Sequence, residues 1–105
     1  MVFIETTLFT KLLPDYLTDD QYRELQIFLM KRPGFGDLIQ GTGGLRKLRW
    51  SIENKGKRGG IRLIYYWEIK NKHIYMMTLY GKNEVSDLSA QEKKLLKNLL
   101  DRWVL

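Results

Sequence analysis

The stretch NKGKRGGIRLIYY (residues 54–66) places a cluster of cations directly before a run of apolar residues. Its cations are Lys55, Lys57, Arg58 and Arg62, and its glycines are Gly56, Gly59 and Gly60. Cations at this density repel one another, and the phosphates of a polyanion relieve that repulsion. Glycine also lets the backbone approach a ligand closely. The stretch therefore predicts a phosphate-binding site where the apolar run begins.

The residues before this stretch are also rich in cations. The chain carries a net charge of +6, and residues 46–62 alone hold seven cations against one acid. A cluster of this kind favours nucleic acid as the partner over a merely soluble basic face. The residues expected to hold nucleic acid are Arg46, Lys47, Arg49 and Arg58.

Arg62 is the residue best suited to contact a phosphate. It opens a strand that is otherwise built for the core, and a guanidinium cannot lose its charge there. It must therefore reach solvent at the end of the sheet, bind an anion or pair with a carboxylate. The carboxylates that could pair with it are Glu53, Glu68 and Glu84.

The order of the strands brings further groups toward Arg62. In an antiparallel meander the end of one strand lies beside the start of the strand before it. This arrangement places Tyr80, expected to stack on a base, next to Arg62. The cations expected to converge at this edge are Lys55, Lys57, Arg62 and Lys82.

Conventional catalytic groups are scarce. The chain has no cysteine, and its single histidine, His73, begins a strand, where we expect a structural role. No Ser-His-Asp or Cys-His arrangement and no metal cluster is evident, so no cofactor is expected. RNA cleavage remains possible because a base can activate the 2′-OH of the RNA while cations stabilise the charge on the phosphoryl oxygens. A lysine crowded by other cations can act as that base.

Periodicity and capping signals predict the secondary structure. Residues 45–52 alternate between apolar and polar side chains, which is typical of a half-buried antiparallel strand. Capping boxes at Thr18–Gln21 and Ser89–Glu92 predict the starts of two helices.

The predicted fold is α+β, in a single domain spanning residues 1–105. A small antiparallel sheet, made of a first strand and a three-stranded meander, packs with N-terminal helices and a C-terminal helix. We expect the helices to cover one face of the sheet. The expected order is a strand at 2–5, a short helix ending near Pro14, a helix at 18–32, strands at 45–52, 61–69 and 73–81, and a helix at 89–105.

Composition also indicates the compartment. No stretch approaches the ~18 consecutive apolar residues of a membrane span, and the opening residues MVFIETTLFTKLL lack the basic start of a secretory signal. Without cysteine there is no disulfide framework. We therefore expect a cytoplasmic protein with no membrane partner.

Three motifs resemble the HigB-type toxins of the RelE/ParE superfamily, which belong to type II toxin–antitoxin pairs. They are IQGTGGLRKLRW (39–50), NKGKRGGIRLIYY (54–66) and YGKNEVSDLS (80–89). The resemblance runs over nearly the whole chain, and the length and order of elements agree with it. It implies a RelE-like fold and a ribosome-dependent mRNA endonuclease (an mRNA interferase) that inhibits translation.

The resemblance also implies partners and site residues. A cognate antitoxin would neutralise the protein, and operator DNA would be bound only through that antitoxin. Arg62 would contact the scissile phosphate with Lys82, while Lys55 and Lys57 are candidates for base and charge stabilisation. Cleavage would yield a cyclic phosphate without a metal. The catalytic tyrosine of RelE has no counterpart in SDLS (86–89), so no general acid is assigned.

Two other functions use the same charge. A non-catalytic nucleic-acid-binding module would bind with steep salt dependence and would not cleave. A ParE-like gyrase poison would spare RNA and disturb supercoiling. The dense basic turn at residues 55–58 favours RNA cleavage over gyrase poisoning.

Overall fold

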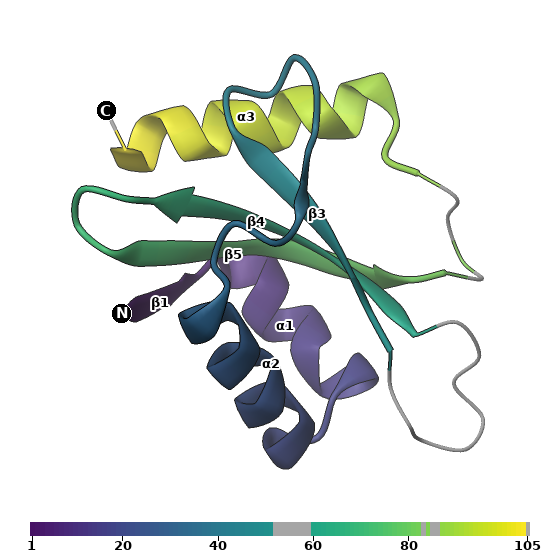
Figure 1. Cartoon of the computed structure of the whole chain (residues 1–105). Helices are drawn as coiled ribbons and strands as arrows, with labels where there is room; N and C mark the ends of the chain where they lie inside the picture. Colours follow the sequence, from purple (N-terminus) through teal and green to yellow (C-terminus); the bar gives the residue numbers. More distant parts are fainter. Residues whose placement is uncertain (52–59, 83, 85–86, 105) are drawn as a thin grey trace.

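The computed structural model describes residues 1–51, 60–82, 84 and 87–104. Within them, a five-stranded sheet lies between helices (Figure 1). In spatial order, its strands are β1 (Val2–Glu5), β5 (His73–Gly81), β4 (Ile61–Glu68), β3 (Leu45–Trp50) and β2 (Asp37–Leu38). The helices are α1 (Thr7–Tyr16), α2 (Asp19–Lys31) and α3 (Ala90–Val104). The predicted α+β fold, with its first strand and meander, is confirmed.

The pairing of the strands is mixed rather than wholly antiparallel. β3 with β4 and β4 with β5 pair antiparallel, as the meander predicts. β1 runs parallel to β5, and the two-residue β2 adds an antiparallel edge to β3 that the sequence did not indicate. A bulge between Ile64 and Tyr65 leaves Met77 of β5 without an opposite residue on β4. The buried Thr6 hydroxyl donates to the Met77 carbonyl at 2.7 Å and secures this irregular position.

The expectation that all helices cover one face of the sheet is wrong. Figure 1 shows α3 on one side of the strands and α1 with α2 on the other. Leu63 and Tyr65 of β4 belong to the core with α1 and α2, whereas Ile64 packs in the core with α3. The physical reason is visible in β4 itself, because a strand that is apolar on both faces must be covered on both faces.

Both predicted capping boxes are present, and α1 ends close to the predicted position. Thr18 and Gln21 form a complete capping box at the start of α2, and Ser89 and Glu92 exchange the corresponding bonds before α3. For α1 the predicted end is near Pro14, and the helix continues two residues beyond it to Tyr16. Proline lacks the N–H of one helical hydrogen bond, but the helix extends far enough to bring Tyr16 toward the end of β5.

Gly60 marks the place where the ends of three strands come together. Its φ is +67°, and a Cβ built on it would lie 2.1 Å from the Trp50 carbonyl oxygen at the end of β3. The Gly60 carbonyl in turn accepts from the backbone N–H of Lys82, which follows β5, at 3.4 Å. Only glycine allows this approach.

We predict that Gly60→Ala destabilises the fold more than Gly41→Ala. Both glycines have positive φ, but a Cβ at Gly41 would meet nothing within 4 Å. Gly41→Ala should cost about 1 kcal/mol for its left-handed backbone, and Gly60→Ala about 1–3 kcal/mol more for the clash with Trp50. Urea unfolding of the two variants measures the difference. Equal losses would contradict the close approach of β3 and β4.

Candidate nucleic-acid interface

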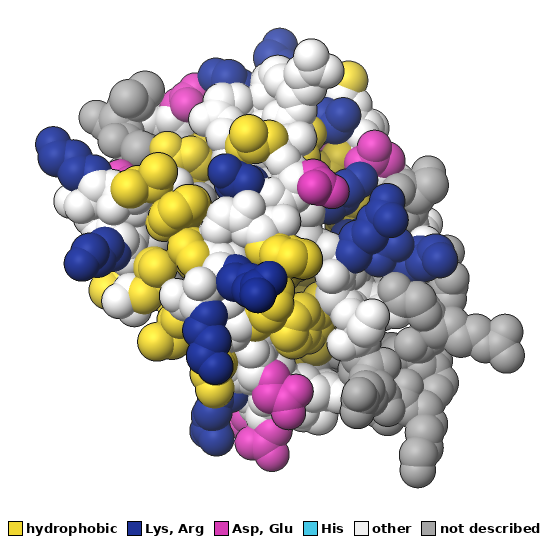
Figure 2. All heavy atoms as spheres, viewed as in Figure 1, with side chains coloured by type: hydrophobic (Ala, Val, Ile, Leu, Met, Phe, Trp, Pro, Cys, Tyr) yellow, Lys and Arg dark blue, Asp and Glu magenta, His cyan; other side chains and the backbone are white. Residues whose placement is uncertain are grey.

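One end of the sheet carries cations on the face that α3 covers elsewhere. α3 begins only at Ala90, and its core contacts include Leu45 and Ile64. Because alternate residues of a strand share a face, the side chains beyond that core continue the same surface. We call this surface the basic face, and its residues are Lys47, Arg49, Arg62 and Tyr80, the last of which still belongs to that core. Figure 2 shows Lys and Arg side chains gathered between the start of α3 and the grey residues.

The pairing register aligns three of these residues in one row across the sheet. Arg49 of β3 is paired with Arg62 of β4, and Arg62 is paired with Tyr80 of β5. Directly opposite residues have Cβ atoms about 5 Å apart, and like charges in such pairs are destabilising. Arg49 is exposed and makes no salt bridge within the described part of the chain. An anion bound between the two guanidinium groups would offset their repulsion.

Arg62 is half-buried at the start of β4. Its Nη1 lies 3.4 Å from the carbonyl oxygen of Ile61. Two of its three predicted carboxylate partners can be placed. Glu68 lies at the opposite end of β4, beside His73, and the Glu84 carboxylate accepts a hydrogen bond from Tyr16 at 2.5 Å. The third, Glu53, is outside the described residues.

The sequence suggested that Tyr80 stacks on a base, but the structure does not place it to do so. Its side chain belongs to the core under α3, and the residue is only 7% exposed. Its buried hydroxyl has no hydrogen-bond partner among the described residues. Burial raises the pKa of Tyr80, the carboxylate of Asp87 raises it further, and Arg62 opposes both. Tyr80 is therefore a neutral hydroxyl that forms part of the floor beside Arg62.

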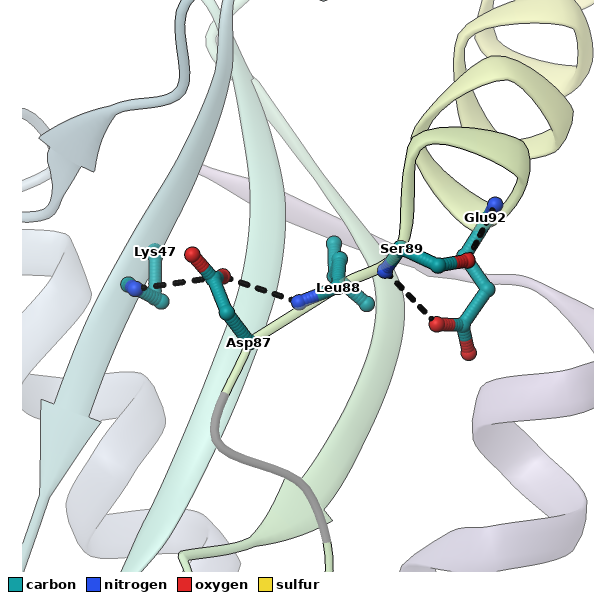
Figure 3. A network of polar contacts seen from close by, with 5 residues as sticks. All are labelled: Lys47, Asp87, Leu88, Ser89 and Glu92. Atoms are coloured by element: carbon teal, nitrogen blue, oxygen red, sulfur yellow. Dashed lines mark hydrogen bonds and ion pairs between the residues drawn. The ribbon is translucent and has the colours of Figure 1, made fainter.

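Asp87 joins the basic face from the segment before α3 (Figure 3). Its Oδ1 lies 3.4 Å from the Lys47 Nζ and accepts a hydrogen bond from the Leu88 N–H at 2.8 Å. The Leu88 N–H is the main cause of the lowered pKa of Asp87, to which Lys47 also contributes. Asp87 is thus a carboxylate at neutral pH. Asp87 could not be singled out from the sequence, because a contact between residues forty positions apart has no local signal.

Arg46 lies on the other side of the strand from Lys47 and Arg49. Its Nη1 donates to the carbonyl oxygens of Gly34 at 2.9 Å and Gly36 at 2.8 Å. Its cross-strand partner Tyr65 donates to Pro33 at 2.7 Å and accepts from the Gly36 N–H at 2.9 Å. Arg46 therefore fastens the loop after α2, and the structure separates it from the cations with which the sequence grouped it.

The remaining predicted residues divide into three groups. Lys82 is exposed, and its backbone N–H donates to the carbonyl of Gly60, which precedes Arg62 by two residues, so the convergence of Lys82 with Arg62 stays a prediction. Lys55, Lys57 and Arg58 lie outside the described residues. His73 is at the far end of the β4–β5 pair, where its Nδ1 is 3.2 Å from a Glu68 oxygen, so its place agrees with a structural role.

The described residues contain neither a metal-binding cluster nor a membrane-spanning helix. No group of three or more His, Asp and Glu residues there could hold a metal ion. No helix among the same residues is long and apolar enough to cross a membrane.

A solved structure with the same fold is a double arginine-to-alanine mutant of the Escherichia coli toxin RelE in the free state. The TM-score is 0.58 over 81% of this chain and 86% of that one, with 11% sequence identity. Identity this low establishes a shared fold and no more.

The family is shown by sequence. The family model "RelE toxin of RelE / RelB toxin-antitoxin system" matches residues 35–104, which include β2 to β5 and α3. The match covers more than half of the chain and contains all four residues of the basic face. This chain therefore belongs to the RelE family of toxins from toxin–antitoxin systems.

Proposed function

We propose that this protein is a HigB-type, ribosome-dependent mRNA endonuclease that inhibits translation in the cytoplasm. A cognate antitoxin would neutralise it, and operator DNA would be bound only through that antitoxin. Family membership supports a toxin. The observation that carries the proposed chemistry is the placement of Arg49 directly opposite Arg62, at the end of the sheet beyond the start of α3.

A phosphate would lie between Arg49 and Arg62, with Lys82 at the adjacent end of β5. Guanidinium groups bind phosphate oxygens by paired, charge-assisted hydrogen bonds. Asp87 forms an ion pair with Lys47 on the same face. A second phosphate of the RNA would therefore compete with the Asp87 carboxylate for that lysine. Arg46 is left out of this surface because backbone carbonyls engage its guanidinium.

The reaction would use the nucleophile that RNA carries. A base removes the 2′-OH proton, the 2′ oxygen forms a bond to the adjacent phosphorus, and the bond to the 5′ oxygen breaks. The leaving 5′ oxygen takes up a proton from water, which gives a 2′,3′-cyclic phosphate and a 5′-hydroxyl. Arg62 and Lys82 would stabilise the charge on the phosphoryl oxygens. Lys55 and Lys57 remain the candidates for the base.

We predict that Arg62→Ala abolishes most cleavage of a reporter mRNA in a purified translation system. Loss of one group that stabilises transition-state charge lowers the rate by about 10²–10³. Primer extension with ribosomes present or omitted measures the cuts. The matched control is Arg23→Ala, which removes an exposed arginine of α2 whose only described ion pair is a weak contact with Asp20.

The outcomes of this experiment separate the alternatives. Cuts that require ribosomes and Arg62, but not Arg23, support the proposal. Full cleavage by Arg62→Ala would contradict the site. An uncut message with translation intact would contradict mRNA cleavage, and a supercoiling assay would then separate a binding module from a gyrase poison.

We also predict that Arg49→Ala weakens RNA binding and makes it less salt-dependent. Each phosphate contact to single-stranded RNA contributes about 0.7 to the slope of log K against log salt. The slope should therefore fall by about 0.7 for a short 2′-O-methyl RNA, which binds without being cleaved. Fluorescence anisotropy over a salt series measures it.

The control for this series is Lys70→Ala. Lys70 is an exposed cation in the turn between β4 and β5, at the end of the pair away from Arg62. It should leave the slope unchanged. Identical slopes for wild type and Arg49→Ala would contradict a phosphate contact at Arg49.

A further inference from the structure

Lys82 follows β5 in a turn that backbone hydrogen bonds hold at Lys82 and Glu84. The Lys82 N–H donates to the Gly60 carbonyl at 3.4 Å, and the Glu84 N–H donates to the Gly81 carbonyl at 3.1 Å. The turn therefore fixes where the chain leaves β5 beside the start of β4. The position of Lys82 relative to Arg62 depends on this turn.

One carboxylate oxygen joins the turn to α1. The Glu84 Oε1 accepts from the Gly81 N–H at 2.8 Å and from the Tyr16 hydroxyl at 2.5 Å. Tyr16 is the last residue of α1, and α1 packs along β5. Hydrogen bonds to a carboxylate are stronger than those between neutral groups. Two elements far apart in the sequence are thus tied at a single atom.

The proton needed for this contact is retained at physiological pH. Burial, followed by the hydrogen bond to Glu84, raises the pKa of Tyr16 to about 12. The hydroxyl therefore remains a donor at neutral pH.

Gly81 is required by the carboxylate rather than by its backbone conformation. A Cβ at this position would lie 2.8 Å from the Glu84 Oε1, which is closer than a Cβ comes to an atom that is not bonded to it or its neighbours. Its φ does not fall in the left-handed region. A side chain at this position would therefore push the Glu84 carboxylate away from the Gly81 N–H and Tyr16.

We propose that Tyr16, Gly81 and Glu84 form a latch that holds Lys82 in position to bind RNA. The inference rests on the proposed function and assigns no chemical step to the latch. Tyr16 and Glu84 are positioning residues, which act on the RNA through Lys82.

The test compares variants that keep or break the latch. Tyr16→Phe and Glu84→Ala each remove one partner, and each should raise the Kd for 2′-O-methyl RNA by about tenfold, the loss of one charge-assisted contact at Lys82. Glu84→Gln keeps an oxygen acceptor and should stay within about twofold of wild type. In the cleavage assay, the first two variants should raise KM more than they lower kcat.

The matched control is Tyr22→Phe. Tyr22 also donates to a glutamate, Glu5, at 2.7 Å, but it lies on α2, away from Lys82. Tyr22→Phe should lower the melting temperature without changing the Kd. Equal changes in Kd for Tyr16→Phe and Tyr22→Phe would contradict the latch, because they would indicate general destabilisation.

Other outcomes also decide the proposal. An unchanged Kd in Tyr16→Phe would contradict it, and if that variant does not fold, a wild-type Kd in Glu84→Ala would do so. Failure of the wild type to cleave mRNA would contradict the proposed function alone, since the Kd values of the variants still test whether the latch positions Lys82.

Discussion

The register in which β3, β4 and β5 pair is the constraint on which the candidate site depends. It places Arg49, Arg62 and Tyr80 in one row, on the face that α3 covers elsewhere. A slip of one residue would turn each of these side chains to the opposite face of the sheet. Gly60 allows β3 and β4 to approach each other closely at this end, because there is no room for a side chain between it and Trp50. The positions of the charges and the packing of the core are therefore set by the same hydrogen-bonded ladder.

The position at which α3 begins determines which part of the sheet RNA could reach. Where α3 lies, Ile64 and Leu45 are buried; beyond its start, the same face presents Arg49 and Lys47. Asp87 stands at this boundary, fixed by the Leu88 N–H and paired with Lys47. The basic face is thus bordered by a carboxylate, which would restrict the places where a phosphate can bind. Tyr80 lies next to Arg62 as a buried neutral side chain, and its ring is not exposed.

Much of the fold could be predicted because patterns of neighbouring residues determine it. The alternation around Leu48 and the capping boxes of α2 and α3 are determined by neighbouring residues. The parallel β1–β5 pair and the division of the helices between two faces depend on distant contacts. A signal for two-sided burial was present in the apolar pattern of β4. At the site, alternation placed Lys47 and Arg49 together, but the same alternation sends Arg46 to the other face, where it binds backbone carbonyls. Asp87 and Tyr16 could not be found this way, since tertiary contacts alone give them their roles.

The most direct test of the account is to map where a short 2′-O-methyl RNA binds, using amide chemical shifts of the labelled protein. We expect the shifts to concentrate at the basic face and its borders, namely Lys47, Arg49, Arg62, Tyr80, Lys82 and Asp87. Shifts confined to the surface of α2 (Asp19–Lys31), with these six residues unchanged, would contradict the central claim that the basic face is the RNA-binding surface.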